Sequence, residues 1–178
     1  RLKDNHTREK ILKLVKPILY SKKIDLNNKD DIQDFIRLSE DYFAFLIADK
    51  NYKECIKYYN DKIKSIDFSY DKIKNKITAF NNNINCQMNS LNWDESFAGY
   101  EEKIQYLDDA LEKHKFDKDT EIEIYNQLID SLIAVAGGYN ITGFSQEEFD
   151  KKVTYLERAR KLNDNYMKSE SLYRYLYS

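Results

Sequence analysis

The segment FDKKVTYL at residues 149–156 has two earlier counterparts, YEEKIQYL at residues 100–107 and YKECIKYY at residues 52–59. The three segments begin 48 and 49 residues apart, and these repeated segments decide the fold. Each starts with an aromatic residue, has Ile or Val four positions later, and has Tyr two positions after that. Self-similarity at a fixed period indicates a stacked repeat protein, in which neighbouring units bury a continuous core.

The composition is typical of a helical globular protein. The chain has 178 residues, of which 42% are apolar and 34% charged, which suits a folded core and argues against disorder. Pro occurs once and Gly four times, whereas β-sandwiches and barrels need many turns that contain these residues. We therefore expect an all-α fold.

Charge and hydropathy argue against two classes of partner. The formal net charge is −2 and no basic stripe stands out, so we expect no nucleic-acid partner. No apolar run approaches the roughly 18 residues that span a bilayer, so we expect no membrane span. The expected location is the cytoplasm. Because the chain begins at Arg1 rather than Met, we interpret it as a processed or trimmed product, from which an N-terminal address could have been lost.

Apolar residues spaced by three and four positions predict amphipathic helices along nearly the whole chain. Pro17 lies inside the first helix, which therefore either kinks or divides into two pieces. Gly137 and Gly138 are expected to end the sixth helix by supplying a positive φ. Ser145 and Glu148 have the spacing of a capping box at the start of the seventh. The predicted helices cover residues 7–21, 31–49, 51–66, 70–90, 93–114, 120–136, 145–163 and 165–177.

These helices predict one domain over residues 1–178. Each repeat pairs a helix with the following helix that carries the repeated segment. The repeats then cover residues 31–67, 70–116 and 120–164, with flanking helices over residues 7–21 and 165–177. Short connections place neighbouring helices antiparallel. The exception within the repeats, residues 137–144 (GGYNITGF), is either a binding loop or a tolerated surface insertion.

The helices that carry the repeated segment resemble the second helix of a tetratricopeptide repeat. In FDKKVTYLERARKL at residues 149–162, Leu156 stands at the large buried position and Ala159 at the late small position. In YEEKIQYLDDAL at residues 100–111, Leu107 and Ala110 match the same places. The resemblance covers about residues 31–164. It implies an α-solenoid of about three antiparallel helix pairs, with seven or eight helices in all.

The chain also departs from that family. Its period of 48–49 residues exceeds the family's roughly 34, which implies longer helices in a divergent solenoid. The early small position holds Cys55 in the first copy but Lys103 and Lys152 in the other two. Lys62 stands in the first copy where Ala is expected.

In tetratricopeptide proteins the first helix of each pair lines a concave groove, and that implies a candidate binding surface here. The candidates are Asn126, Gln127 and Asp130 on the sixth helix, with Thr78, Asn82 and Asn85 on the fourth. Polar amides at these positions would hydrogen-bond an extended peptide. The alternative is that they are ordinary solvent-facing residues. Basic residues that clamp a peptide carboxylate are not evident there, so a receptor for C-terminal peptides is not expected.

No convincing active site is found in the sequence. His6 and His114 are the only histidines, and His114 stands at a predicted helix end, where a cation favours the helix dipole. Zinc-binding, phosphate-binding and nucleophile motifs are missing, so we expect neither catalysis nor a metal or cofactor. Cys55 and Cys86 are interpreted as buried apolar residues of a reducing compartment. The run of Asn at residues 81–83 is interpreted as compositional bias rather than as a site.

Three functions remain open. The first is a non-catalytic scaffold that binds a protein or peptide partner through its helical repeats. The second is a structural subunit of a large assembly, bound through its terminal helices. The third is the sensor half of a regulator whose effector domain lies outside this chain. Only the architecture supports this third function.

Overall fold

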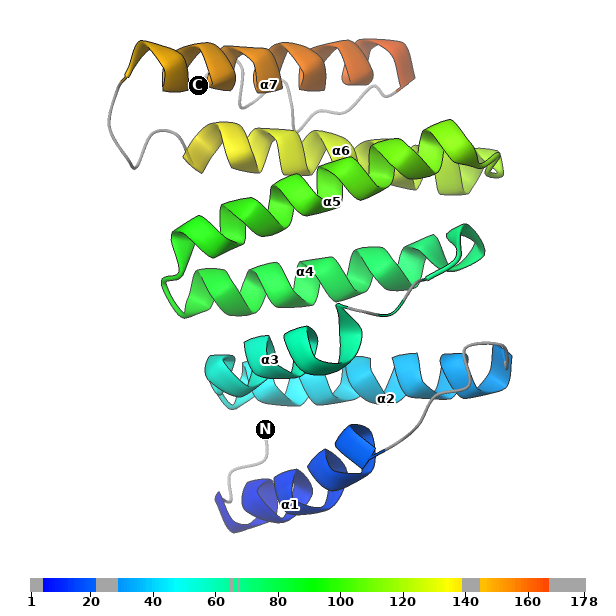
Figure 1. Ribbon diagram of the computed structural model, residues 1–178, viewed down its shortest axis with the longest axis vertical. Coiled ribbons are helices and arrows are strands. Elements are labelled where there is room, and N and C mark those ends of the chain that lie inside the picture. The colour runs from blue at the N-terminus through cyan, green and yellow to red at the C-terminus, as the bar shows by residue number, and fades with distance from the viewer. Residues whose placement is uncertain (1–4, 22–28, 65, 67, 139–144, 167–178) are drawn as a thin grey trace. The chain divides into compact units, whose positions relative to one another are not determined.

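The computed structural model describes residues 5–21, 29–64, 66, 68–138 and 145–166. Every regular element within those residues is helical, which confirms the all-α prediction (Figure 1). Contacts divide the chain into two compact units, Arg1–Asp67 and Phe68–Ser178, called unit 1 and unit 2 below. Unit 1 contains α1 (Asn5–Ser21), α2 (Lys29–Ala48), α3 (Tyr52–Tyr58) and a π-helical segment (Tyr59–Ile63). Unit 2 contains a 3₁₀ turn (Tyr70–Lys72), α4 (Ile73–Asn89), α5 (Trp93–Lys113), α6 (Lys118–Gly138) and α7 (Gln146–Tyr166).

The observed helices follow the predicted ones closely, with differences at several ends. Pro17 lies within one continuous α1. The sixth helix ends at Gly138, at the predicted pair of glycines, but Gly138 lies within the last turn of α6 without the expected positive φ. Asn165 continues α7 rather than starting another helix. The rest of the predicted eighth helix and most of the loop at residues 137–144 lie outside the described residues.

In unit 1 a single carboxylate, that of Glu54 on α3, joins side chains from three helices. It accepts hydrogen bonds from Lys16 Nζ at 2.7 Å, Tyr20 Oη at 3.1 Å and Tyr42 Oη at 3.4 Å. Nearby, the hydroxyl groups of Tyr58 and Ser39 lie 2.8 Å apart. Tyrosine suits such a core because its ring packs among apolar groups while its hydroxyl finds a polar partner.

The first repeated segment departs from α-helical geometry where its sequence departs from the other copies. The α-helical hydrogen bonds of α3 end at Tyr58, and a π-helical segment follows that contains Lys62. The ammonium of Lys62 donates to the main-chain oxygen of Tyr20. The π geometry therefore coincides with a position where a long polar side chain replaces the expected Ala. π segments occur mostly as single turns within α-helices.

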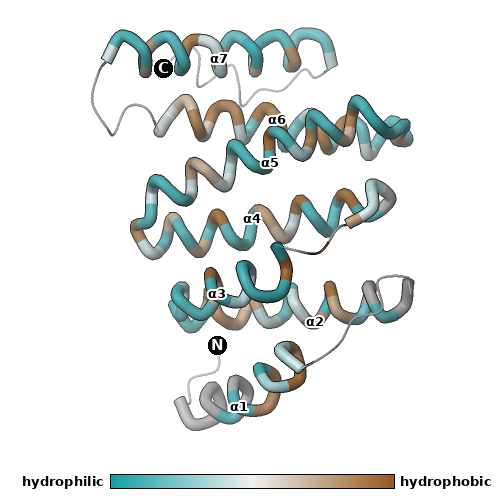
Figure 2. The backbone as a smooth tube through the Cα atoms, viewed as in Figure 1, coloured by the Kyte–Doolittle hydropathy of each residue, from teal (hydrophilic) through white to brown (hydrophobic). Residues whose placement is uncertain are grey.

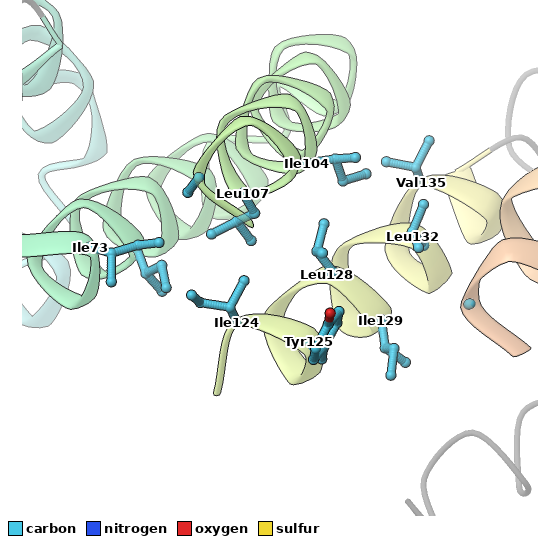
Figure 3. Close-up of a cluster of buried hydrophobic side chains, with 12 residues drawn as sticks. Ile73, Ile104, Leu107, Ile124, Tyr125, Leu128, Ile129, Leu132 and Val135 are labelled. Atoms are coloured by element: carbon cyan, nitrogen blue, oxygen red, sulfur yellow. The ribbon is translucent and has the colours of Figure 1, made fainter. Parts of the chain in front are cut away.

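In unit 2 consecutive helices pack on one another, α4 on α5, α5 on α6 and α6 on α7. Figure 2 shows a mostly hydrophobic tube for α6 and a largely hydrophilic one for α7. The buried cluster of unit 2 draws half of its twelve side chains from α6, more than from any other helix (Figure 3). Its members are Ile73, Ile77, Ile104, Leu107, Ala110, Ile124, Tyr125, Leu128, Ile129, Leu132, Val135 and Ala159.

The positions that resemble a tetratricopeptide repeat are buried as expected in the second copy, but in the third copy Leu156, expected at the large buried position, is only half-buried. Leu107, Ala110 and Ala159 are all fully buried. The start of the third copy is different, since Phe149 and Val153 on α7 are 49% and 37% exposed. In the part of the chain that the structure describes, no helix is long and apolar enough to cross a membrane.

The state of the two cysteines differs from the expectation that both are reduced. Cys55 on α3 and Cys86 on α4 are both fully buried, as the sequence predicts for small apolar residues. Neither is a free thiol, however, so the interpretation as two reduced side chains is wrong. The inference of a reducing compartment loses its basis with it.

Ala159 offers a direct test of the packing of α7. We expect Ala159→Arg to lower the free energy of unfolding by about 3 kcal/mol or more, because the side chain overpacks the core and brings in a charge. Urea unfolding followed by circular dichroism measures the loss. Glu157→Arg, the same introduced residue at an exposed position of α7, is the matched control and should change stability little. Equal stability of the two variants would contradict this packing.

Gly138 is required for close packing rather than for a positive φ. A Cβ atom built there would lie 2.4 Å from the ring of Phe97 on α5, closer than carbon atoms approach. We expect Gly138→Ala to cost about 1–2 kcal/mol, although Ala is the better helix former by about 1 kcal/mol. Once Phe97→Ala has removed the ring, the same substitution should become neutral or stabilising. A thermal double-mutant cycle tests this reversal of sign, and an unchanged penalty would refute it.

Candidate functional site

A buried lysine on α5 joins three helices of unit 2. Lys103 is only 2% exposed, and its ammonium reaches between α4 and α6. It donates to Asn81 Oδ1 on α4 at 2.8 Å and to Gln127 Oε1 on α6 at 2.6 Å. The Nδ2 group of Asn81 also donates to Gln127 Oε1 at 3.3 Å, which closes a triangle of polar groups. Lys103, Asn81, Gln127 and the neighbouring Asp130 are called the polar cluster below.

A second contact holds α4 beside α6. The Nζ of Lys74 lies 2.8 Å from Glu123 Oε2, and both side chains are exposed. A surface ion pair of this kind contributes little stability, about 0–1 kcal/mol, but it reports the alignment of the helices. From Lys74 to Asn81 along α4, the partners advance from Glu123 to Gln127 along α6. The two helices therefore run in the same direction along this shared edge.

Burial shapes the electrostatics of the polar cluster. It lowers the pKa of the Lys103 ammonium to about 8, and the negative charge of Asp130 opposes that shift. Partial burial raises the pKa of the Asp130 carboxyl, and the charge of Lys103 counteracts the rise. Burial, followed by the charge of Asp130, raises the pKa of the Tyr100 hydroxyl. Lys103 and Asp130 thus each favour the charged form of the other, against the effect of burial.

The structure brings together two of the six predicted site residues. Gln127 and Asp130 belong to the polar cluster, and Asn126 lies half-buried next to Gln127 on α6. On α4 the residue that contacts α6 is Asn81 rather than Asn82, which is half-buried one position away.

The remaining two predicted residues bond within α4. The hydroxyl of Thr78 donates to the main-chain oxygen of Lys74 at 3.0 Å. Asn85 Oδ1 accepts from Asn89 Nδ2 at 2.6 Å, and both residues are exposed. Neither side chain belongs to the polar cluster. They lie on the same helix as Asn81 and extend a row of polar residues along it.

Lys103 and Asn81 were not among the predicted site residues, although the sequence contains a feature at each position that could have identified it. Lys103 occupies the position where the first copy of the repeat has the small residue Cys55, and that correspondence could have indicated a buried position. A lysine at a buried position needs polar partners, because an uncompensated charge is costly inside a protein. Asn81 belongs to the run of Asn that was interpreted as compositional bias, and the structure places its side-chain oxygen on the ammonium of Lys103.

Other candidate groups do not assemble into a site. His114 is the residue that caps α5, and its exposed ring contacts Phe116 edge to face with centroids 4.7 Å apart. Trp93 begins α5 and is 38% exposed. Among the described residues, no group of three or more His, Cys, Asp or Glu side chains is arranged to hold a metal ion.

The lowered pKa of Lys103 predicts how stability depends on pH. The folded protein releases this proton near pH 8, whereas an unfolded lysine releases it near 10.4. The unfolded chain therefore binds more protons between these values, and the free energy of unfolding should rise with pH, by at most about 1.4 kcal/mol per unit. Urea midpoints at pH 7.6, 8.2 and 8.8 measure the rise, at pH values where unfolded tyrosines, with a pKa near 10, are still mostly protonated.

Lys103→Met removes the titrating group and should abolish that rise. The matched control is Lys152→Met, the same substitution at the corresponding position of the third copy, and it should keep the rise. A rise that persists in Lys103→Met would show that another group causes the pH dependence.

Comparison with known proteins leaves this architecture without an identified relative. No family model matches the chain, and no curated protein or solved structure matches it significantly. The resemblance to tetratricopeptide repeats therefore rests on the quoted residues alone. The polar cluster and its surroundings are the part of the chain from which a function can be argued.

Proposed function

We propose that this chain is a non-catalytic module that binds a protein or peptide partner through the face shared by α4 and α6. The observation that carries the proposal is the hydrogen bond between Asn81 and Gln127 above the buried ammonium of Lys103. It joins the polar rows of two helices into one surface. Proteins that bind extended peptides use such rows of amides, because the main chain of the ligand offers regularly spaced polar groups.

The contacts of unit 2 support a stacked arrangement of helix pairs. Asn81 and Gln127 are 46 residues apart, close to the period of the repeat. On the neighbouring pair, Tyr155 donates to Glu101 at a separation of 54 residues and Arg158 donates to Asp108 at a separation of 50. Contacts between α4 and α6, and between α5 and α7, thus join residues that are about one repeat period apart in the sequence. In each pair of helices, residues further along one helix contact residues further along the other. A divergent tetratricopeptide-like solenoid has these features, with its first helices lining the binding face.

A structural role in a large assembly is the second candidate, and exposed apolar side chains favour it. Leu14 and Ile18 on α1 are 68% and 57% exposed and lie one helical turn apart. Phe149 and Val153 on α7 are likewise exposed and one turn apart. Exposed apolar groups on outer helices are suited to burial against neighbouring subunits.

Selection from a random dodecapeptide phage library tests the first candidate. We expect peptides to be enriched on the immobilised chain. Asn126→Arg and Asn85→Arg should each weaken binding of a selected peptide about tenfold or more, because a bulky charge would obstruct the face. Gln105→Arg, at an exposed position of α5, is the matched control. Fluorescence anisotropy of the labelled peptide measures affinity. No enrichment, or equal affinity for all three variants, would contradict the proposal.

The two candidates predict different partners in cells. Affinity purification of the tagged chain, at low and at high salt, separates them when co-eluting proteins are quantified by mass spectrometry. Partners in fixed ratio that survive high salt would mean an assembly subunit. Partners below that ratio, lost when Asn126 and Asp130 are replaced by Ala, would mean a binding face of the proposed kind.

A further inference from the structure

The orientation of two side-chain amides follows from what Lys103 can offer. An ammonium group has three donors and no acceptor, so only the oxygen of a neighbouring amide can face it. The oxygen and nitrogen of an amide are otherwise hard to distinguish by shape. Here the Nζ of Lys103 is within hydrogen-bond distance of both Asn81 Oδ1 and Gln127 Oε1. The buried charge therefore fixes both amides with their oxygens inward.

The nitrogen atoms of the same amides must then point away from Lys103. Asn81 is exposed and Gln127 half-buried, so neither side chain is closed off from the surface. Asn81 Nδ2 uses one of its two N–H groups on Gln127 Oε1. Among the described residues, Gln127 Nε2 has no hydrogen-bond partner. Both amide oxygens are engaged internally, so this part of the face offers donors to a ligand and few acceptors.

We propose that Lys103 is a positioning residue that turns the amide N–H groups of Asn81 and Gln127 outward to recognise main-chain carbonyl oxygens of a bound peptide. The inference rests on the proposed function and names the ligand group that the face selects. A neutral carbonyl suits the site better than a carboxylate does. Asp130 interacts electrostatically with Lys103 from the edge of the cluster, so the charge of the ammonium is countered rather than free to attract an anion.

Isosteric variants separate this role from a merely structural one. Gln127→Glu and Asn81→Asp keep an oxygen for Lys103 but replace the outward N–H group with a second, negative oxygen. We expect each to weaken binding of an amidated peptide selected on the wild-type chain by about tenfold or more, because a donor becomes a repelling acceptor. The melting temperature of Gln127→Glu should stay the same or rise, because Lys103 gains a charged partner. Asn81→Asp gains the same partner but loses the hydrogen bond to Gln127 Oε1, so its melting temperature should not exceed that of the wild-type chain.

Substitutions in the peptide provide a readout that leaves the protein unchanged. A thioamide replaces one carbonyl oxygen with sulfur, which accepts hydrogen bonds poorly. Scanning thioamides along the selected peptide should reveal one or two positions where affinity for the wild-type chain falls about fivefold or more. The same positions should matter little for Gln127→Glu, which has already lost the donor. Lys103→Met, which frees both amides to rotate, should also reduce the sensitivity to thioamides.

The outcomes distinguish failure of this inference from failure of the proposed function. If Asn126→Arg blocks the peptide while Gln127→Glu and Asn81→Asp bind it normally, the peptide uses the face without these donors and the inference is wrong. A wild-type chain that tolerates thioamides at every position would overturn it as well. Selected peptides that require a free carboxylate would refute the preference for a neutral carbonyl. If Asn126→Arg also binds normally, the proposed function itself fails.

Discussion

Unit 2 depends on the burial of α6 between its two neighbours. Leu128 and Leu132 are fully buried, and the same helix contributes Ile124, Ile129 and Val135 to one continuous cluster. Burying each such side chain contributes roughly 1.5–3 kcal/mol before conformational entropy is subtracted. A helix with so many apolar positions cannot remain stable with one side exposed, so α5 and α7 are both needed. The close approach of Gly138 to Phe97 belongs to the same constraint, because it brings the end of α6 against α5.

The polar cluster lies beside this core and serves a different purpose. Hydrophobic burial is not directional, and it would tolerate sliding of α4 along α6. Lys103 is flanked in sequence by the buried Ile104 and Leu107, yet its ammonium requires oxygen partners on both other helices. Any sliding would leave a buried charge without partners, which is costly. The lysine therefore contributes specificity of alignment rather than stability, and the alignment sets which side chains share the α4–α6 face.

The helices could be predicted from the sequence because their signals are local. Apolar residues three and four positions apart mark α4, α5, α6 and α7, and the repeated segment identifies Leu107, Ala110 and Ala159 as buried. The site was predicted only in part. Gln127 and Asp130 were named, whereas Asn82 was named in place of Asn81, one position and about 100° around the helix. That rotation depends on how α4 packs, which no local pattern specifies. Gly138 was misinterpreted for a similar reason, since the ring it accommodates comes from a distant part of the chain.

The attachment of α1 follows a different logic from that of the other helices. Its described side chains include one fully buried apolar residue, Leu19, whereas Leu14 and Ile18 are exposed. Its side-chain hydrogen bonds to α3 converge on the carboxylate of Glu54, through Lys16 and Tyr20, and Lys62 adds one to the main-chain oxygen of Tyr20. A helix held in this way opens at a lower free energy than the rest of its unit. The N-terminal helix would then exchange its amide hydrogens with solvent by a sub-global opening, ahead of α2 and α3. Neutralising one carboxylate would be enough to speed that exchange.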